Sequence, residues 1–450
     1  MREIAGIIVL LPLVTWFLTH KKHPDIADPY NIYTALYSLN VLIPTFLYAD
    51  ANVVYTIKEA YIRDSVLDNS VYFTYAVLQT ICYYLVVFGC KLSIKRVTEN
   101  LTNLHGRNES EKCNQQFNYK KYEKIGIVLW LIGVFSFFVI MKQVGGVYYF
   151  FTHLQYRTSL TRNIDFWTWI LPFVNYGTLF VVYSYKGTEK KLAVGTIIMI
   201  VLSGIMSGLG GRKALLILFI EAILLYHYCV KKIKIKQFIK PKYVFAAFAL
   251  YLFFILMSKF RTEGAIESFI QNPILFVSES NNGILSTIRK ESYVTFYMTI
   301  INHFKSHALW YGRTFWGLIT AIVPSSLFPA KPPVDDGAYL YSICIGKTDI
   351  IPPLPFSKLD GSSLPLETFG SMYANFGTIG LIFGMIALGG IYGHSYRKMK
   401  RNSYDLYDVI IYIQIIFTFQ LSTLRIFQLF ELIVVWRVVT FLSERVKVKC

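Results

Sequence analysis

The chain has 450 residues, of which 54% are hydrophobic, 17% are aromatic and only 16% are charged. A soluble protein would carry about 25% charged residues, and the apolar residues here form long runs, so the composition excludes a large soluble enzyme and indicates a membrane protein. The formal net charge is +18. Because Lys and Arg cluster in short segments between the apolar runs, this charge is typical of cytoplasmic loops rather than of a nucleic-acid-binding surface.

The apolar runs predict the fold class. A helix needs about 20 apolar residues to cross the hydrocarbon of a bilayer. On this measure the sequence predicts an all-α, polytopic integral membrane protein with about eleven (10–12) transmembrane helices. The first run is followed by no small-residue cleavage site, so we interpret it as a span and not as a signal peptide. The predicted spans lie near residues 4–19, 31–48, 71–90, 125–141, 166–185, 192–209, 214–230, 243–257, 369–393, 407–423 and 426–442.

The basic loops predict the topology. Lys and Arg concentrate in alternate loops and in the carboxyl-terminal tail, so these segments should face the cytoplasm and the amino terminus should lie outside. On the outer side, a segment of more than a hundred residues is too long for a structureless loop and should fold. The predicted organisation is therefore residues 1–257 with helices one to eight, 258–368 as an extracytoplasmic helical and re-entrant loop subdomain, and 369–450 with the last three helices and a basic tail.

Two pieces of the long loop have a recognisable pattern. Residues 280–304 have the apolar spacing of an amphipathic helix. Residues 315–328 are too short to span, and Pro324 interrupts them, so we expect a re-entrant or interfacial piece that brings Lys331 to the membrane surface.

Cations gather in the segments predicted to face outward. Arg offers phosphate a planar pair of donors and Lys adds a point charge, so a face rich in both suits a lipid-linked diphosphate. The alternative for any single residue is a side chain that extends to the lipid headgroups. At Arg212 the preceding small residues of "SGLGGR" would leave backbone amides free to face an anion. The cations of interest are Arg157, Arg212, Arg261, Arg313 and Lys331.

Carboxylates and histidines supply candidate bases. Glu367 stands at the mouth of the ninth predicted span, where it is either a partner of the helix dipole or a functional group. Asp335 and Asp336 follow two prolines and are predicted to be solvated loop residues. His303 and His307 lie four residues apart and so can share a helical face, where one could act as a base. No metal-binding motif surrounds them, and we expect no metal site.

Small residues and buried acids mark helix packing. The pairs Gly204–Gly208, Gly380–Gly384 and Gly389–Gly393 have the GxxxG spacing and are predicted to be packing faces. Glu221 and Glu431 lie within apolar helices, where an acid is a functional candidate or is paired structurally; we favour pairing for Glu431 and leave Glu221 open.

Four stretches, taken in order, carry a resemblance. They are "GGVYYFF…YRTSL", "SGLGGRKALLIL", "YGRTFWGLITAIVPSSLFPAKP" and "ETFGSMYANFGTIGLIFG". Together with the late, long outer loop, they resemble the bacterial O-antigen and capsular oligosaccharide repeat-unit polymerases of the Wzy type.

The resemblance implies a fold related to the GT-C type and a multi-pass protein of the bacterial cytoplasmic (inner) membrane whose active face is extracytoplasmic. It implies a metal-independent glycosyltransferase that moves a growing glycan from undecaprenyl diphosphate onto the next lipid-linked oligosaccharide. It also implies contact with membrane lipids, and a chain-length regulator and a flippase as possible partners, but no nucleic acid. The alternatives are a ligase of the O-antigen type and a transporter or flippase for the same lipid-linked glycans.

The resemblance also gives roles to the candidate residues. Arg212, Arg261 and Arg313 would hold the diphosphate, with Lys331 and Arg157 assisting. The base would be Glu367, or else His303 or His307. No cofactor and no metal are implied, since cations can neutralise the leaving diphosphate.

Overall fold

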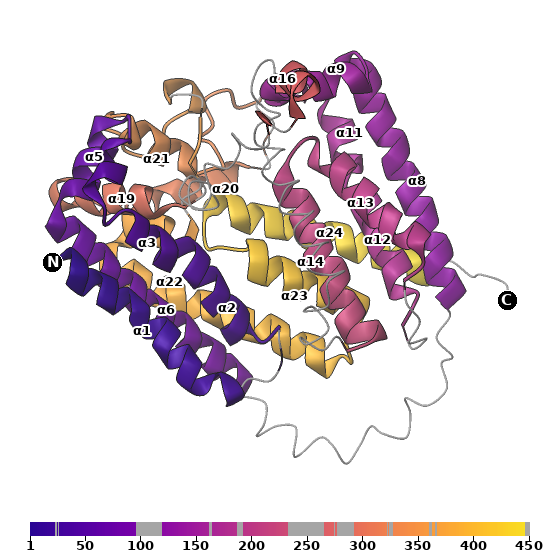
Figure 1. The fold of residues 1–450 in the computed structure, drawn as a ribbon, viewed down its shortest axis with the longest axis horizontal. Helices are drawn as coiled ribbons and strands as arrows, with labels where there is room; N and C mark the ends of the chain where they lie inside the picture. The colour runs from indigo at the N-terminus through magenta and orange to yellow at the C-terminus, as the bar shows by residue number, and fades with distance from the viewer. Residues whose placement is uncertain are drawn as a thin grey trace. The chain divides into compact units, whose positions relative to one another are not determined.

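The computed structural model describes residues 1–22, 25, 27–95, 119–161, 164–186, 192–232, 265–273, 275–276, 292–321, 323, 327–359, 362–364 and 367–445. Over these ranges the chain is helical and contains no strand, which confirms the all-α prediction (Figure 1). The chain divides into two compact units. Unit 1 comprises Met1–Glu111, Ile284–Ser403 and Gln414–Arg437, and unit 2 comprises Lys112–Gly283, Tyr404–Ile413 and Val438–Cys450.

Unit 1 combines helices from the amino-terminal part of the chain with helices from its carboxyl-terminal half, and it contains the candidate site. In chain order they are α1 (Arg2–Thr19), α2 (Pro29–Tyr37), a π-helical turn (Ser38–Leu42), α3 (Ile43–Leu47), α4 (Ala51–Tyr55), α5 (Ala60–Leu67), α6 (Asn69–Lys95), α19 (Val294–Ser306), a 3₁₀ turn (Arg313–Phe315), α20 (Trp316–Thr320), α21 (Gly337–Cys344), a 3₁₀ turn (Phe356–Lys358) and α22 (Glu367–Arg401).

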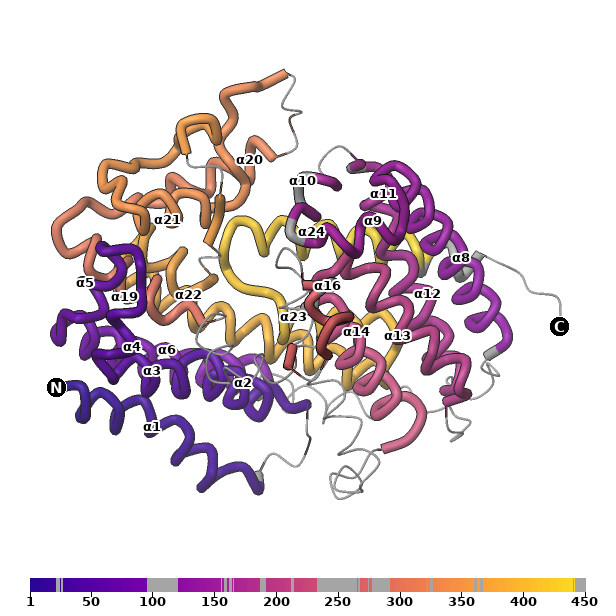
Figure 2. Tube along the Cα trace, turned by 45° about the horizontal axis from the view of Figure 1, so that its top comes forward, coloured from indigo at the N-terminus to yellow at the C-terminus, as the bar shows by residue number. Residues whose placement is uncertain are grey.

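Unit 2 is built around four neighbouring helices, α8, α12, α13 and α14 (Figure 2). Its helices are α8 (Tyr119–Val144), α9 (Val147–Thr152), α10 (Arg157–Thr161), α11 (Asp165–Ile170), α12 (Phe173–Tyr183), α13 (Val194–Gly208), α14 (Arg212–Leu225), a π-helical turn (Tyr226–Val230) and α16 (Ala265–Gln271). Helices α23 (Leu406–Thr418) and α24 (Thr423–Arg445) each contribute a part to both units.

Most predicted spans coincide with helices. Among the described residues, five helices are long and apolar enough to cross a membrane, namely Arg2–Thr19, Asn69–Ile94, Lys120–Val144, Phe166–Tyr183 and Glu367–Arg401. Three shorter apolar helices lie at Val194–Gly208, Ala214–Val230 and Leu406–Thr418. The predicted span 243–257 lies outside the described residues, as do residues 280–291 of the predicted amphipathic helix 280–304. Residues 294–304 of that helix belong to α19.

Glycines let α6 and α22 approach closely in unit 1. A Cβ atom on Gly389 would overlap the carbonyl oxygen of Val86, and one on Gly393 would lie 2.6 Å from the carbonyl oxygen of Cys90. On the other side of the contact, a Cβ on Gly89 would overlap the carbonyl oxygen of Ile386. Close approach of this kind is how small residues stabilise helix pairs in membranes. The prediction that Gly389–Gly393 is a packing face is therefore confirmed.

Helix α22 is two helices joined at a sharp reversal. Gly377 has φ 63° and ψ −149°, outside the helical region. A Cβ on Gly384 would lie 2.5 Å from Cγ of Met372, whereas twelve residues of straight helix would separate the two by about 18 Å. Residues 367–376, which we call the hairpin helix, therefore fold back along the rest of α22. The sequence predicts a span near 369–393, and the structure divides this region at Gly377, with the second helix running on to Arg401.

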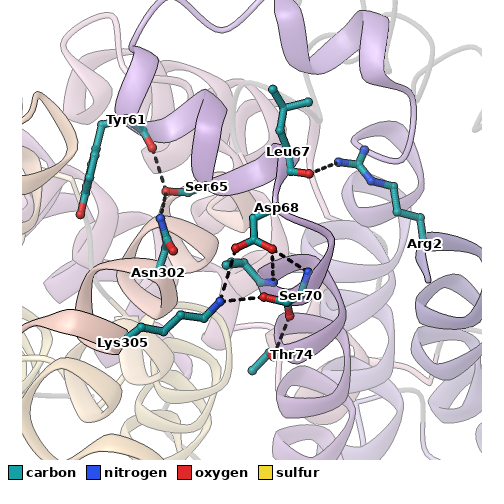
Figure 3. Close-up of polar contacts among 10 residues, drawn as sticks. Arg2, Tyr61, Ser65, Leu67, Asp68, Ser70, Thr74, Asn302 and Lys305 are labelled. Atoms are coloured by element: carbon teal, nitrogen blue, oxygen red, sulfur yellow. Dashed lines mark hydrogen bonds and ion pairs between the residues drawn. The ribbon is translucent and has the colours of Figure 1, made fainter.

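Polar contacts fix α19 against the start of α6 (Figure 3). Lys305 donates to Oγ of Ser70 at 2.8 Å and lies 3.5 Å from the Asp68 carboxylate, and Asn302 donates to Ser65 at 3.1 Å. Asp68 also accepts the backbone N–H of Ser70 at 2.7 Å, as an amino-terminal cap of α6. Burial opposes ionisation of Asp68, but these hydrogen bonds outweigh it and lower its pKa. These contacts fix the position of α19, the helix that carries Tyr297 of the candidate site.

Candidate functional site

Glu367 begins the hairpin helix in a strained conformation. Its φ is +46°, in the left-handed region that residues with a side chain rarely adopt. Its Oε2 accepts a hydrogen bond from the Tyr297 hydroxyl of α19 at 3.0 Å. Burial, and then the neighbouring Glu367 carboxylate, raise the pKa of Tyr297 well above its ordinary value, so this tyrosine remains a donor. Strain of this kind often accompanies a functional role.

Glu367 lines a cavity inside unit 1. The cavity has a volume of about 120 Å³ and is bounded by α2, the π-helical turn after it, α6, α19, α22 and the end of α23. In a straight helix Glu367 and Tyr392 would be about 38 Å apart, yet both line this cavity because the hairpin helix folds back. Glu367 is the first residue of α22, as the sequence predicts, and the fold-back of the hairpin helix brings it to the wall of this cavity. The polar residues of the wall are Tyr33, Tyr37, Asn40, Gln79, Tyr293, Tyr297, Glu367, Tyr392 and Gln420.

The first turn of the hairpin helix is held from two directions. Thr368 donates its hydroxyl to the Gln420 side chain at 2.6 Å and accepts the backbone N–H of Leu421 at 2.8 Å. One turn further on, the Ser371 hydroxyl donates to Oδ2 of Asp336 at 2.8 Å. These bonds fix the direction in which Glu367 enters the cavity.

Asp336 is buried, which corrects the prediction that it is a solvated loop residue. Its side chain is 1% exposed, and its backbone N–H donates to the Thr423 hydroxyl at 3.2 Å. Burial raises the pKa of this carboxyl to about 6, although the hydrogen bond from Ser371 opposes the rise. Asp336 thus ties the hairpin helix to the start of α24.

The stretch that begins at Tyr311 contacts the stretch that begins at Glu367, at the carboxyl-terminal end of the hairpin helix. The backbone N–H of Tyr311 donates to the carbonyl of Asn375 at 2.8 Å, and the Asn375 amide donates to the Thr314 hydroxyl at 2.9 Å. Arg313 lies in this contact segment and is exposed. Because Asn375 is eight residues after Glu367, about 12 Å of helix separates the two ends. Arg313 and Glu367 therefore occupy opposite ends of the hairpin helix.

The two histidines lie away from the cavity. His303 is 2% exposed and shares a hydrogen bond with the Tyr61 hydroxyl at 3.1 Å. It stacks on His307 with 4.1 Å between ring centroids. Burial, followed by the neighbouring His307, lowers the pKa of His303 to about 4. Neither histidine is among the cavity-lining residues of the described chain, so Glu367 is the candidate base that the cavity contains.

The side chain of Lys331 forms a hydrogen bond within its own loop. Its ammonium donates to the carbonyl of Val323 at 2.8 Å. The preceding helix α20 is short, and Pro324 lies outside the described residues. The expectation of a re-entrant piece at 315–328 therefore stays a prediction. The fold-back that the structure shows lies in another segment, the hairpin helix.

The remaining cations belong to unit 2. Residues 208–212 form the predicted tight corner, with Leu209 and Gly210 at positive φ before α14 begins at Arg212. Nη1 of Arg157 lies close to this corner, since a Cβ on Gly211 would be 3.1 Å from it. The structure thus brings Arg157 next to the turn that carries Arg212. The side chain of Arg212 and the whole of Arg261 lie outside the described residues.

Sequence reasoning missed most of the cavity wall. The five tyrosines of the wall come from three separate segments, and of these only Tyr392 lies on the same helix as Glu367, α22. One signal was available at Gln79, a polar residue in the middle of an apolar span. A second was Gly377, since a glycine within an apolar helix can mark a break.

Comparison with known proteins gives one match. The model of the O-antigen polymerase family matches residues 31–300, which is more than half of the chain. No curated protein and no solved structure matches. The matched region contains Tyr33, Gln79 and Tyr297 of the cavity and ends before Arg313 and Glu367.

Proposed function

Because the chain belongs to the O-antigen polymerase family, we propose that this multi-pass membrane protein joins undecaprenyl-diphosphate-linked oligosaccharide repeat units into a surface polysaccharide at the outer leaflet of the cytoplasmic membrane. The growing glycan leaves its lipid diphosphate and is transferred to the non-reducing end of the next lipid-linked unit. The family match and the helices long enough to cross a membrane support this assignment.

One observation carries the chemical part of the proposal: Glu367 is held by Tyr297 at the wall of a cavity. A hydroxyl of the acceptor sugar forms the new bond to the anomeric carbon of the donor, and its proton passes to the Glu367 carboxylate. The bond between the anomeric carbon and the diphosphate breaks, and the diphosphate leaves with the electron pair. A positioned base of this kind contributes about 10²–10⁴-fold to the rate.

The cations neutralise the leaving group. Because a diphosphate is already charged, it needs positive groups rather than a proton donor. The proposed set is Arg157, Arg212, Arg261, Arg313 and Lys331. Of these, the structure describes the side chain of Arg157 in unit 2 and those of Arg313 and Lys331 in unit 1.

The test is chain growth by the purified protein in lipid vesicles supplied with lipid-linked repeat units. We expect Glu367→Gln to reduce the rate of polymerisation at least about 100-fold. The matched control is Glu431→Gln, since Glu431 is a partly buried acid of α24 that does not line the cavity. Normal polymer from Glu367→Gln, at an equal amount of folded protein, would refute the assignment of the base.

A further inference from the structure

The charge of the cavity wall restricts its ligand. Among the described residues that line the cavity, Glu367 is the one carboxylate, and no Lys, Arg or His accompanies it. A diphosphate placed here would be desolvated beside a carboxylate with no cation to balance it, which is strongly unfavourable. The rest of the polar wall consists of hydroxyl and amide groups, which suit a neutral ligand that carries hydroxyls.

Gln79 supplies an independent indication of a ligand. It lies on α6, is 6% exposed and lines the cavity. Its Nε2 has no hydrogen-bond partner among the described residues. Buried side-chain donors nearly always have a partner, so an unpaired one at the wall of a cavity points to an acceptor atom on a bound molecule.

The neighbouring wall has further features of a sugar site. Asn40 lines the cavity from the π-helical turn Ser38–Leu42, a type of turn that is frequent at functional sites. Tyr37, Tyr297 and Phe369 add aromatic surface. The volume of about 120 Å³ exceeds the roughly 10–15 Å³ that one water needs by about an order of magnitude. The space therefore accepts a group of many atoms.

We infer that this cavity is the acceptor subsite, which binds the uncharged terminal sugar of the incoming repeat unit while the diphosphates remain outside it. Gln79 donates from Nε2 to a hydroxyl or acetamido oxygen of that sugar. Glu367 accepts from the hydroxyl that attacks. The inference rests on the proposed function and adds to it which part of which substrate this cavity recognises.

The first test measures access to the cavity in the full-length protein. Asn40→Cys, in a variant whose native cysteines are replaced, provides an exposed thiol at the wall. We expect free repeat-unit oligosaccharide, without lipid or diphosphate, to slow alkylation of this thiol about 3- to 10-fold. Inorganic pyrophosphate at the same concentration should have no effect. Protection by pyrophosphate, or no protection by the oligosaccharide, would overturn the inference.

The second test concerns Gln79 itself. Gln79→Met keeps the size of the side chain and removes the unpaired donor, so it should raise the KM for the acceptor about 3- to 10-fold and raise by the same factor the oligosaccharide concentration needed to protect the thiol. It should also raise the Tm of the ligand-free protein, because a buried unpaired polar group is lost. A purely structural role predicts the opposite, a lower Tm with an unchanged KM. The control is Gln428→Met, at an exposed glutamine of α24.

The outcomes for the two proposals are separable. If Glu367→Gln abolishes polymerisation but Gln79→Met leaves the acceptor KM and the protection unchanged, the subsite is wrong and the proposed function stands. If the oligosaccharide protects the thiol and Glu367→Gln still polymerises, the subsite stands and the role of Glu367 as base fails.

Discussion

The sharpest prediction concerns Gly377, because the fold-back that places Glu367 in the cavity depends on it. The conformation at φ 63° and ψ −149° is accessible almost only to glycine. Forcing alanine into such a region costs about 1–3 kcal/mol. Alanine also favours the straight helix, which competes with the fold-back, by about 1 kcal/mol over glycine.

These two terms act in the same direction, so Gly377→Ala should weaken the fold-back by about 2–4 kcal/mol. With a factor of ten for every 1.4 kcal/mol, this lowers the ratio of folded-back to straight chains by about 30- to 700-fold. A further small term follows because the new Cβ would lie 3.2 Å from Leu309 Cδ1. Glu367 would leave the cavity in the straight form, so polymerisation should fall with the population of the fold-back.

The assay is a disulfide that only the fold-back allows. Met372→Cys and Gly384→Cys, introduced together in a cysteine-free variant, place two thiols where Met372 now contacts Gly384. Mild oxidation should consume both thiols, as measured by loss of maleimide labelling, and adding Gly377→Ala should reduce this reaction. The matched control is Gly390→Ala, whose new Cβ would meet no atom closer than 3.6 Å. Equal disulfide yield and normal polymer in the Gly377→Ala protein would refute the reasoning.

Three further predictions follow from the same unit. Burial raises the pKa of Asp336 from 3.8 to about 6, so the folded protein binds this proton more tightly than the unfolded chain and loses up to about 3 kcal/mol as pH rises from 4 to 6 and above. Asp336→Asn should therefore match the wild-type Tm near pH 4 and exceed it near pH 8; an equal difference at both pH values would contradict this. Gly389→Ala should lower the Tm in detergent because its Cβ meets a carbonyl oxygen of α6, whereas Gly390→Ala should not; equal Tm values would contradict the packing. Tyr297→Phe removes the hydrogen bond to the Glu367 carboxylate, so kcat should fall about 10- to 100-fold with normal protein levels; an unchanged kcat would show that Tyr297 does not position Glu367.

The sequence predicts the helices well because hydrophobic length and GxxxG spacing are local signals. Residues 71–90 and 125–141 fall within α6 and α8, and the corner before Arg212 lies where its glycines predict it. The helix-pair contacts at Gly389 and Gly393 follow from small residues alone. These features need no information about which distant segments meet.

The site could be predicted only in part, because it depends on contacts between segments that are far apart in the sequence. The sequence singles out Glu367 but cannot tell that Gly377 reverses the helix, since glycine within an apolar helix is also compatible with close packing. It likewise predicts Asp336 as solvated from the neighbouring prolines. The burial of Asp336 follows instead from its contacts with Ser371 and Thr423, residues that are 35 and 87 positions away.

In the proposed reaction, the hairpin helix keeps the charged leaving group apart from the neutral acceptor. Its two ends present different chemistry about 12 Å apart: the contact segment with the exposed Arg313 at Asn375, and the carboxylate of Glu367 within a wall of tyrosines. If Arg313 bound the diphosphate directly above Glu367, the carboxylate and the phosphates would repel each other in a region of low dielectric. In the proposed arrangement, separation along one helix would reduce this repulsion and leave the carboxylate free to accept a proton from a sugar hydroxyl. The donor sugar, rather than the diphosphate, would then lie between the two ends.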